Sequence, residues 1–309
     1  MRVFVTGASG WIGSAVVDEL LGAGYEVVGL ARSEASARSL EAKGATVQPG
    51  DLDDLNSLRA GARGADAVVH LANKHDFANP AVSNKAERDA VQTFGDALAG
   101  SDRPFLLASG AAGIVQGRAA LESDVSPNVG PDSMRGGAEN LALDFVERGV
   151  GSVSVRFAPT VHGHRDHGFV SAIVGAAQST GVSGYVGDGT NRWAAVHRGD
   201  AARLVRLGLE KAAPGTVLHA VAEEGIPTRT IAEAIGAGLH IPVESVRAED
   251  AQEHFGFIGL FFGFEMSASS AATRKLLDWT PTGATLLEDI ADGAYFEPAT
   301  AHGAAATAS

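Results

Sequence analysis

The chain has 309 residues, 45% of them apolar, and a formal net charge of −13 from 24 basic and 37 acidic residues. This acidic balance, without a basic run, argues against nucleic acid and anionic membranes as partners. The absence of cysteine excludes disulfides, thiolate catalysis and thiolate metal sites. No signal-peptide pattern precedes the first strand, and the apolar stretch 255–264 is too short to cross a bilayer, so we expect a soluble cytoplasmic protein.

The first predicted element is a strand at residues 3–6, which a glycine-rich turn joins to a helix at 14–21. Gly7 permits a tight turn, Gly10 lets a pyrophosphate approach the backbone, and Gly13 lets the helix pack closely on the sheet. The helix N-terminus then presents free N–H groups to the phosphates. The residues expected to bind a dinucleotide here are Gly7, Ser9, Gly10, Trp11, Ile12 and Gly13.

Short apolar strands and amphipathic helices alternate through the first half of the chain. The predicted strands are 25–30, 45–48, 67–70, 104–108 and 152–156, and the predicted helices are 34–43, 55–61, 85–99 and 134–148. This alternation predicts an α/β fold, a Rossmann-type doubly wound parallel sheet covered on both faces, over residues 1–160.

The alternation breaks after Pro159. Helices are predicted at 169–179, 200–210, 230–239, 270–277 and 286–295, and extended segments at 194–197 and 217–221. We expect residues 161–297 to form a small, partly helical substrate lobe that is interleaved with the first domain. Residues 298–309, rich in alanine, are predicted to be a disordered tail.

Five segments together resemble the extended, or atypical, short-chain dehydrogenase/reductase superfamily, which includes epimerases and dehydratases. They are the glycine-rich loop, 50–52, 68–72, 156–163 and 196–200. The resemblance covers nearly the whole chain and implies a cofactor path. Asp51 and Leu52 would hold the adenine, Leu71 and Ala72 would line the ribose and pyrophosphate, and Pro159 would lie near the nicotinamide. Asp51 has a helix cap as its alternative role.

The residues after the second strand indicate which nicotinamide cofactor is bound. An acidic residue at this strand end usually holds the ribose 2′-hydroxyl of NAD, whereas an arginine suits the 2′-phosphate of NADP. This chain has no carboxylate there and continues with Arg32 and Ser33. A guanidinium can bind a phosphate through two hydrogen bonds. We therefore predict NADP(H) rather than NAD(H), with a solvated surface arginine as the alternative.

The usual catalytic residues of the superfamily, a serine and a Tyr-x-x-x-Lys pair, are missing. With Glu139 at the usual glutamate, Pro131 stands at the tyrosine and Arg135 at the lysine. The chain has no tyrosine between residues 25 and 185. The serine position falls on Gly110, with Ser109 one residue earlier.

Reduction of a carbonyl leaves an alkoxide that needs a proton or electrostatic stabilisation. Arg135 can supply positive charge and bind ribose, but it is a poor proton donor. A histidine is a credible acid near neutral pH. The predicted catalytic residues are Ser109, Arg135, His162 and Lys74, and Ser109 is also expected to contact the cofactor.

The substrate pocket is expected over the carboxyl ends of the strands. Its predicted residues are His75, His164, His167 and Trp193. The histidine spacing does not fit a metal motif, so no metal site is predicted. The aromatic segment 254–264 is read first as packing between lobes or as a dimer surface. If it lines the pocket instead, the substrate is apolar.

Three functions follow from these residues. The first is an NADP(H)-dependent oxidoreductase acting on a C=O, C–OH or C=N bond of a small, rather apolar metabolite. The second is an epimerase, isomerase or cyclase that uses the cofactor transiently or structurally. The third is a non-catalytic NADP(H)-binding sensor. A homodimer is the oligomeric state that the resemblance allows.

Overall fold

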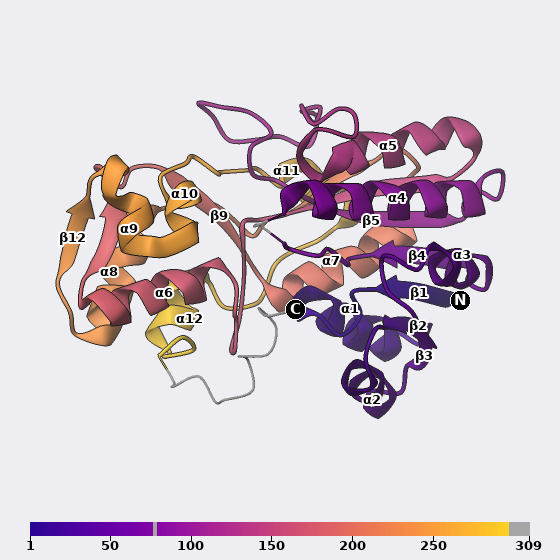
Figure 1. The fold of residues 1–309 in the computed structure, drawn as a ribbon, viewed down its shortest axis with the longest axis horizontal. Helices are drawn as coiled ribbons and strands as arrows, with labels where there is room; N and C mark the ends of the chain where they lie inside the picture. Colours follow the sequence, from indigo (N-terminus) through magenta and orange to yellow (C-terminus); the bar gives the residue numbers. More distant parts are fainter. Residues whose placement is uncertain (77–78, 297–309) are drawn as a thin grey trace.

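The central element of the fold is a seven-stranded parallel sheet with the strand order β10-β6-β5-β4-β1-β2-β3 (Figure 1). The computed structural model describes residues 1–76 and 79–296, so the predicted tail lies outside the described residues. The strands are β1 (Arg2–Thr6), β2 (Glu26–Ala31), β3 (Thr46–Pro49), β4 (Ala67–His70), β5 (Pro104–Gly110), β6 (Gly151–Phe157) and β10 (Val217–Ala220). The β4 and β6 strands are buried along their whole length, as expected for parallel strands covered on both faces.

Helices cover both faces of this sheet, and each face has its own apolar core. One face carries α1 (Trp11–Gly22), α2 (Glu34–Ala42), α7 (Arg198–Lys211) and α11 (Ala271–Leu277). The other carries α3 (Leu55–Arg63), α4 (Pro80–Leu98) and α5 (Ala138–Asp144), which is followed by the 3₁₀ turn Phe145–Arg148. This is the predicted Rossmann-type α/β fold.

The remaining elements form a lobe opposite the carboxyl ends of the parallel strands, at the left of Figure 1. Its strands are β7 (Thr160–His162), β9 (Arg192–His197) and β11 (Glu223–Pro227) in one sheet, and β8 (Ser183–Val186) and β12 (Val243–Val246) in another. Its helices are α6 (Phe169–Thr180), α8 (Thr228–Leu239), α9 (Ala251–Phe255), α10 (Gly259–Phe262) and α12 (Leu286–Ala291). A third core fills it.

The chain crosses between the sheet and the lobe several times. After β7, α6, β8 and β9, it returns to the sheet through α7 and β10. It then forms most of the lobe, and α11 returns to the sheet core through Leu277. The lobe therefore lies within residues 160–296 without occupying all of them.

Local signals begin and end several helices at the observed positions. At the start of α3, the Asp54 side chain accepts hydrogen bonds from two backbone N–H groups. Thr285 and Glu288 form a capping box at the start of α12. Gly181 ends α6 in the left-handed conformation, which glycine adopts without strain. In the described part of the chain, no helix combines the length and the apolar composition that crossing a bilayer requires.

Candidate active site

The predicted cofactor residues all follow strands of the central sheet, so they meet at its carboxyl edge. The glycine-rich loop follows β1, Arg32 follows β2, Asp51 follows β3 and Leu71 follows β4. Ser109 lies near the end of β5. This edge faces the lobe in Figure 1, as expected for a ligand site in an open parallel sheet.

The glycine-rich loop has the shape that a dinucleotide requires. Gly7 has a φ of +65°, and a Cβ there would lie 2.7 Å from the backbone nitrogen of Ala72. A Cβ on Gly13 would lie 2.0 Å from the carbonyl oxygen of Gly7. Gly10 is the N-cap of α1, and among the described residues no side chain caps this helix. The first N–H groups of α1 are thus available to a pyrophosphate.

A buried hydrogen bond aligns the loops after β1 and β4. The hydroxyl oxygen of Thr6 lies 2.6 Å from Nδ1 of His70, and it accepts a hydrogen bond of 3.3 Å from the N–H of Ala72. Thr6 and His70 are both completely buried. Burial lowers the pKa of His70, so the ring is neutral at pH 7. The Thr6–His70 pair positions Ala72 beside Gly7. The sequence pattern did not predict this hydrogen bond.

The loop after β2 presents an arginine with a free charge. The Arg32 side chain is exposed, and it makes no hydrogen bond or ion pair within the described residues. Ser33 caps α2, since its hydroxyl accepts a hydrogen bond of 3.2 Å from the N–H of Ser36. The hydroxyl of Ser33 is therefore already used locally, whereas the guanidinium of Arg32 remains available to a ligand.

Asp51 shapes the turn after β3, and it is not the cap of α3. One oxygen of Asp51 accepts hydrogen bonds from the N–H groups of Asp53 and Asp54, at 2.8 and 3.0 Å. Asp54, not Asp51, caps α3. Asp51 is exposed and Leu52 is buried beside it. The second oxygen of Asp51 has no partner among the described residues, so it is available for the predicted contact with adenine.

Lys74 is bound at this same turn. Its ammonium group lies 2.7 Å from the carboxylate of Asp53, two residues from Asp51. This ion pair ties Lys74 to the predicted adenine end of the site. The geometry therefore gives no support to Lys74 as the catalytic proton donor.

Ser109 is oriented by a buried ion pair. Its hydroxyl donates a hydrogen bond of 2.7 Å to Glu139, and the other oxygen of Glu139 lies 2.7 Å from the Arg156 guanidinium. The side chains of Arg156 and Glu139 are only 1% and 6% exposed. Removing one partner of such a pair leaves a buried charge without compensation. Glu139 therefore acts structurally and fixes the Ser109 hydroxyl.

The segment before α5 corrects the predicted helix 134–148. Arg135, Gly136 and Gly137 have φ values of 55°, 61° and 63°, so all three are left-handed. A Cβ on Gly136 would lie 2.5 Å from the carbonyl oxygen of Asn84. The helix begins only at Ala138. Counting back four residues from Arg135 to Pro131 assumes a helical turn that is absent.

A buried carboxylate holds Arg135 in this turn. Glu87 of α4 has a side chain that is 1% exposed and lies 2.6 Å from the guanidinium of Arg135. Its other oxygen accepts a hydrogen bond of 2.9 Å from the side chain of Asn73, in the loop after β4. The backbone N–H of Arg135 donates to the side chain of Asn84. Sequence reasoning missed Glu87, although it lies three and four residues before the buried Ala90 and Val91 on the apolar face of α4.

Ser109 and Arg135 line the same small cavity, of about 20 Å³, at the end of β5. Two of the four predicted catalytic residues are thus brought together. The charges of Arg135 and Glu87 also act on His75. Although much of its side chain is exposed, surrounding protein desolvates the imidazole and, with the charge of Arg135, lowers its pKa.

The three histidines after β6 lie elsewhere. His162 is completely buried, and its Nδ1 lies 2.6 Å from the carboxylate of Asp289 in α12. Burial lowers its pKa despite this carboxylate. This position does not support His162 as the proton donor at Ser109. His164 is exposed, and the His167 ring makes a T-shaped contact with Trp11, with ring centres 5.6 Å apart.

The prediction that Trp193 lines the substrate pocket is wrong, because this side chain belongs to the lobe core. It is 0% exposed, its indole N–H donates to the carbonyl of Phe264, and its ring packs against Phe262. The alternation of β9 directs this side chain inward, between α6 and α10.

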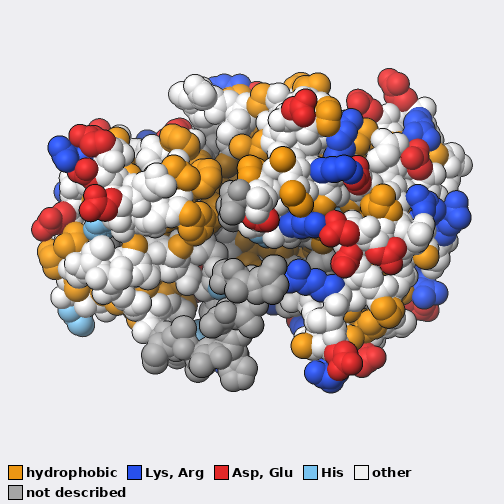
Figure 2. Space-filling model, viewed as in Figure 1, with side chains coloured by type: hydrophobic (Ala, Val, Ile, Leu, Met, Phe, Trp, Pro, Cys, Tyr) orange, Lys and Arg blue, Asp and Glu red, His pale blue; other side chains and the backbone are white. Residues whose placement is uncertain are grey.

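Exposed apolar side chains gather on two segments beside the site. One segment is the loop between β5 and α5, and the other is the aromatic segment 254–264. The exposed residues are Leu121, Val125, Val129, Met134, Phe257, Leu260 and Phe264. The first segment lies near the second, because Ala120 pairs with Ala268, which follows the aromatic segment in sequence. Figure 2 shows hydrophobic atoms on both sides of the hollow between sheet and lobe. The aromatic segment also packs inward, since Phe255 and Phe262 are buried in the lobe core.

Comparisons with known proteins indicate the family of this chain. Residues 3–94 match the model of the NAD dependent epimerase/dehydratase family. The chain is 45% identical to the Schizosaccharomyces pombe protein C2A9.02 over 96% of its own length and 100% of that protein. It is 27% identical to the decarboxylating sterol-4-alpha-carboxylate 3-dehydrogenase of Dictyostelium discoideum, over 74% of this chain and 73% of that one.

Among solved structures, the fold is similar to DesIV of Streptomyces venezuelae, a dTDP-glucose 4,6-dehydratase with NAD bound. The TM-score is 0.74 at 22% identity, over 95% of this chain and 96% of that one. These findings confirm the resemblance and the fold that the sequence predicts. The chain belongs to the extended short-chain dehydrogenase/reductase superfamily and is an NAD(P)-dependent enzyme of the oxidoreductase type.

Proposed function

We propose that the enzyme is an NADP(H)-dependent oxidoreductase that reduces or oxidises a C=O/C–OH or C=N bond of a small, apolar metabolite. The observation that carries this proposal is the convergence of Ser109 and Arg135 on one cavity at the carboxyl edge of the sheet. The exposed apolar side chains beside that edge support an apolar substrate. The sterol dehydrogenase among the relatives acts, by its name, on a sterol carboxylate.

The glycine-rich loop would bind the pyrophosphate, and Arg32 would bind the 2′-phosphate that distinguishes NADP from NAD. The turn at Asp51 and Leu52 would hold the adenine. Pro159 would lie near the nicotinamide. When bound in reduced form, the cofactor supplies the hydride.

Ser109 and Arg135 would act on the substrate oxygen. Negative charge would grow on this oxygen as hydride reaches the carbon. The Arg135 guanidinium would stabilise that charge, and the Ser109 hydroxyl would do so once its single O–H turns from Glu139 to the substrate oxygen. Glu139 and Glu87 hold the two donors in place before the substrate binds. A guanidinium is a poor proton donor, so the proton would come from His75 or from water, either directly or through the Ser109 hydroxyl, which would regain from that donor the proton it passes on.

Steady-state kinetics of Ser109→Ala and Arg135→Gln tests this mechanism. Purified protein is screened with NADPH and aromatic ketones, aldehydes and imines, by following the cofactor absorbance. We expect each variant to lose about a hundredfold in kcat with the best substrate, as for removal of one oxyanion donor. Lys85→Gln, which removes an exposed charge of α4, is the matched control.

Unchanged kcat in both variants would overturn the mechanism. Loss of turnover in Lys74→Gln instead would restore the sequence-based assignment of Lys74. Isomerisation without net cofactor consumption would favour an epimerase or isomerase. The homodimer also remains a proposal, and sedimentation equilibrium of the same protein checks it.

A further inference from the structure

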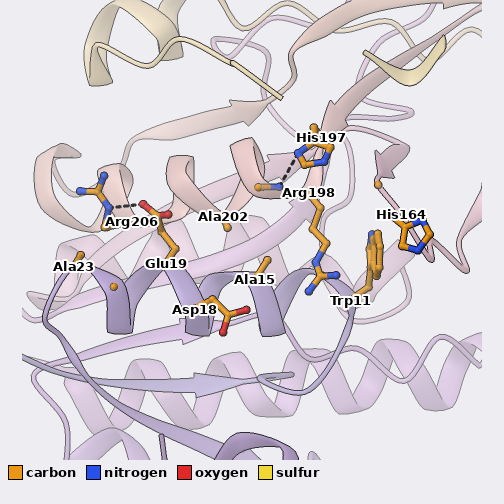
Figure 3. A pocket seen from close by; sticks show the side chains of 13 residues that line it. Trp11, Ala15, Asp18, Glu19, Ala23, His164, His197, Arg198, Ala202 and Arg206 are labelled. Carbon is orange, nitrogen blue, oxygen red and sulfur yellow. Dashed lines mark hydrogen bonds and ion pairs between the residues drawn. The ribbon is translucent and has the colours of Figure 1, made fainter. Parts of the chain in front are cut away.

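A groove of about 770 Å³ runs between α1 and α7, on the face of the sheet that carries both helices (Figure 3). Small residues give it room, with Ala15 and Gly22 on α1 and Gly199 and Ala202 on α7. Trp11 lies at one end. The groove shares no lining residue with the cavity at Ser109, so it is distinct from that cavity.

The charged side chains of the groove are not balanced along its length. Asp18 pairs with Lys43 at 2.5 Å, and Glu19 pairs with Arg206 at 2.7 Å. Arg198, at the Trp11 end, has no carboxylate within ion-pair distance among the described residues. Asp18 and Glu19 are thus neutralised by these pairs. Arg198 lacks such a partner in the described part of the chain, although the charge of Asp18 acts on it at longer range.

Arg198 is nevertheless firmly oriented. It donates a hydrogen bond of 2.6 Å to the hydroxyl of Ser14, and its guanidinium lies 4.3 Å from the centre of the Trp11 ring. Its Nε–H is buried without an acceptor in the described part of the chain. Desolvation lowers its pKa. An anion bound here would compensate this charge without reordering the side chain.

Trp11 is equally fixed. Its indole N–H donates a hydrogen bond of 2.7 Å to the carbonyl of Val161 in β7. In Figure 3 the indole stands between Arg198 and His164, with the alanines of α1 and α7 leading away from it. A rigid aromatic ring, a guanidinium without an ion-pair partner among the described residues and a channel of small side chains suit a flat molecule with one negative end.

We propose that this groove binds a small organic monocarboxylate with a flat apolar body. The carboxylate pairs with Arg198, and the body lies along Ala15 and Ala202 beside the indole. The carboxylates of Asp18 and Glu19 are already paired, so Arg198 is left to bind a single negative charge, and nucleotides and other polyanions would bring charges that find no partner in the groove. Because Trp11 belongs to the glycine-rich loop, a ligand bound in the groove would contact a residue of the predicted cofactor-binding loop.

Calorimetric titration of the full-length protein with 2-naphthoate, repeated with saturating NADPH, tests the proposal. We expect saturable binding of 2-naphthoate under both conditions. We expect none for methyl 2-naphthoate, which lacks the charge, or for inorganic phosphate, which lacks the apolar body. Arg198→Gln and Ala15→Leu should each weaken binding by about tenfold or more, one by removing the charge and the other by filling the groove.

Arg38→Gln, which removes an exposed arginine of α2, is the matched control and should bind as the parent does. Thermal unfolding verifies that each variant is folded. Ala15 is partly exposed on its helix, so we expect Ala15→Leu to fold. This variant therefore still tests the groove if Arg198→Gln does not fold. Absence of saturable naphthoate binding, equal binding by the folded variants, or equally tight binding of phosphate would overturn the proposal.

Discussion

Single glycines determine the shape of the cofactor loop, and their roles were readable from the sequence. Gly7 combines a left-handed φ of +65° with a close approach to the loop after β4. The T-G-x-x-G-x-x-G pattern predicts the tight turn at Gly7, because few other structures need glycines at this spacing. It does not predict the close approach to the loop after β4. The partners of the loop were not readable. Thr6 and His70 lie 64 residues apart, and only folding brings them together.

Gly7→Ala should therefore be more destabilising than the replacement of a glycine that has a positive φ but open space around it. Alanine strains the left-handed backbone by about 1 kcal/mol, and its Cβ would also collide with the backbone of Ala72. We expect loss of NADPH binding and a lower free energy of unfolding in urea. Gly24→Ala is the control, since Gly24 has a φ of +83° with open space around it. Equal effects of the two substitutions would contradict the steric argument.

Arg32 is the residue on which cofactor preference should depend. Its guanidinium has no partner in the described part of the chain, so Arg32→Ala removes no structural contact there. Loss of a charge-assisted hydrogen bond to phosphate should weaken NADPH binding by about tenfold or more. NADH binding should stay unchanged. Fluorescence titration with both cofactors measures this, and an equal loss for both would refute the preference.

At the scale of elements, the turn 134–137 shows where sequence reasoning failed. The apolar spacing correctly predicts α5, but it extends the helix four residues too far. Tandem glycines and an arginine form a left-handed turn there because Asn84 and Glu87 of α4 hold it. Those contacts span about fifty residues of sequence, beyond the reach of local periodicity. The same reasoning found Arg135 but not the carboxylate that orients it.

The Glu87–Arg135 pair should be strongly coupled. We expect a coupling free energy of about 1–3 kcal/mol from the double-mutant cycle of Glu87→Gln and Arg135→Gln, measured by urea unfolding, because the carboxylate is buried. The pair Lys85–Asp89 on the same helix is the matched control, with side chains 77% and 37% exposed. It should give about 0.5 kcal/mol or less. Equal coupling in both cycles would show that burial does not strengthen the contact.

At the scale of the whole molecule, three cores are joined by a chain that crosses repeatedly between sheet and lobe. The sequence predicts the sheet well, since its strands are apolar runs separated by helices. It misses β7, β8, β11 and β12, which are three to five residues long and pair with distant segments. For the same reason it could not place His162 and Trp193, whose surroundings depend on how the lobe folds.

The three cores also enclose imidazoles that must stay neutral. The side chains of His70, His162 and His219 are completely buried, and burial lowers the pKa of each. In the unfolded chain each pKa returns to about 6.5. Above that pH these histidines are neutral in both states and do not change stability. Below it the unfolded chain binds more protons, so the free energy of unfolding decreases.

Each of these histidines contributes at most about 1.4 kcal/mol per pH unit below about pH 6.5. The carboxyls of Asp166, which is buried, and of Glu223, which is partly buried, act in the opposite direction. Burial raises their pKa, so they stabilise the fold as pH falls through their raised values. The net loss of stability between about pH 6.5 and 5 should therefore be smaller than the histidines alone would give.

His70→Asn isolates one of these contributions, since the asparagine amide can still meet the hydroxyl of Thr6. We expect urea unfolding of the variant to show a shallower fall in stability below about pH 6.5 than the parent, by up to about 1.4 kcal/mol per pH unit. His164→Asn removes an exposed imidazole and should follow the parent's slope. If the stability difference between His70→Asn and the parent were the same at every pH, protonation of the buried ring would not be what destabilises the fold in acid.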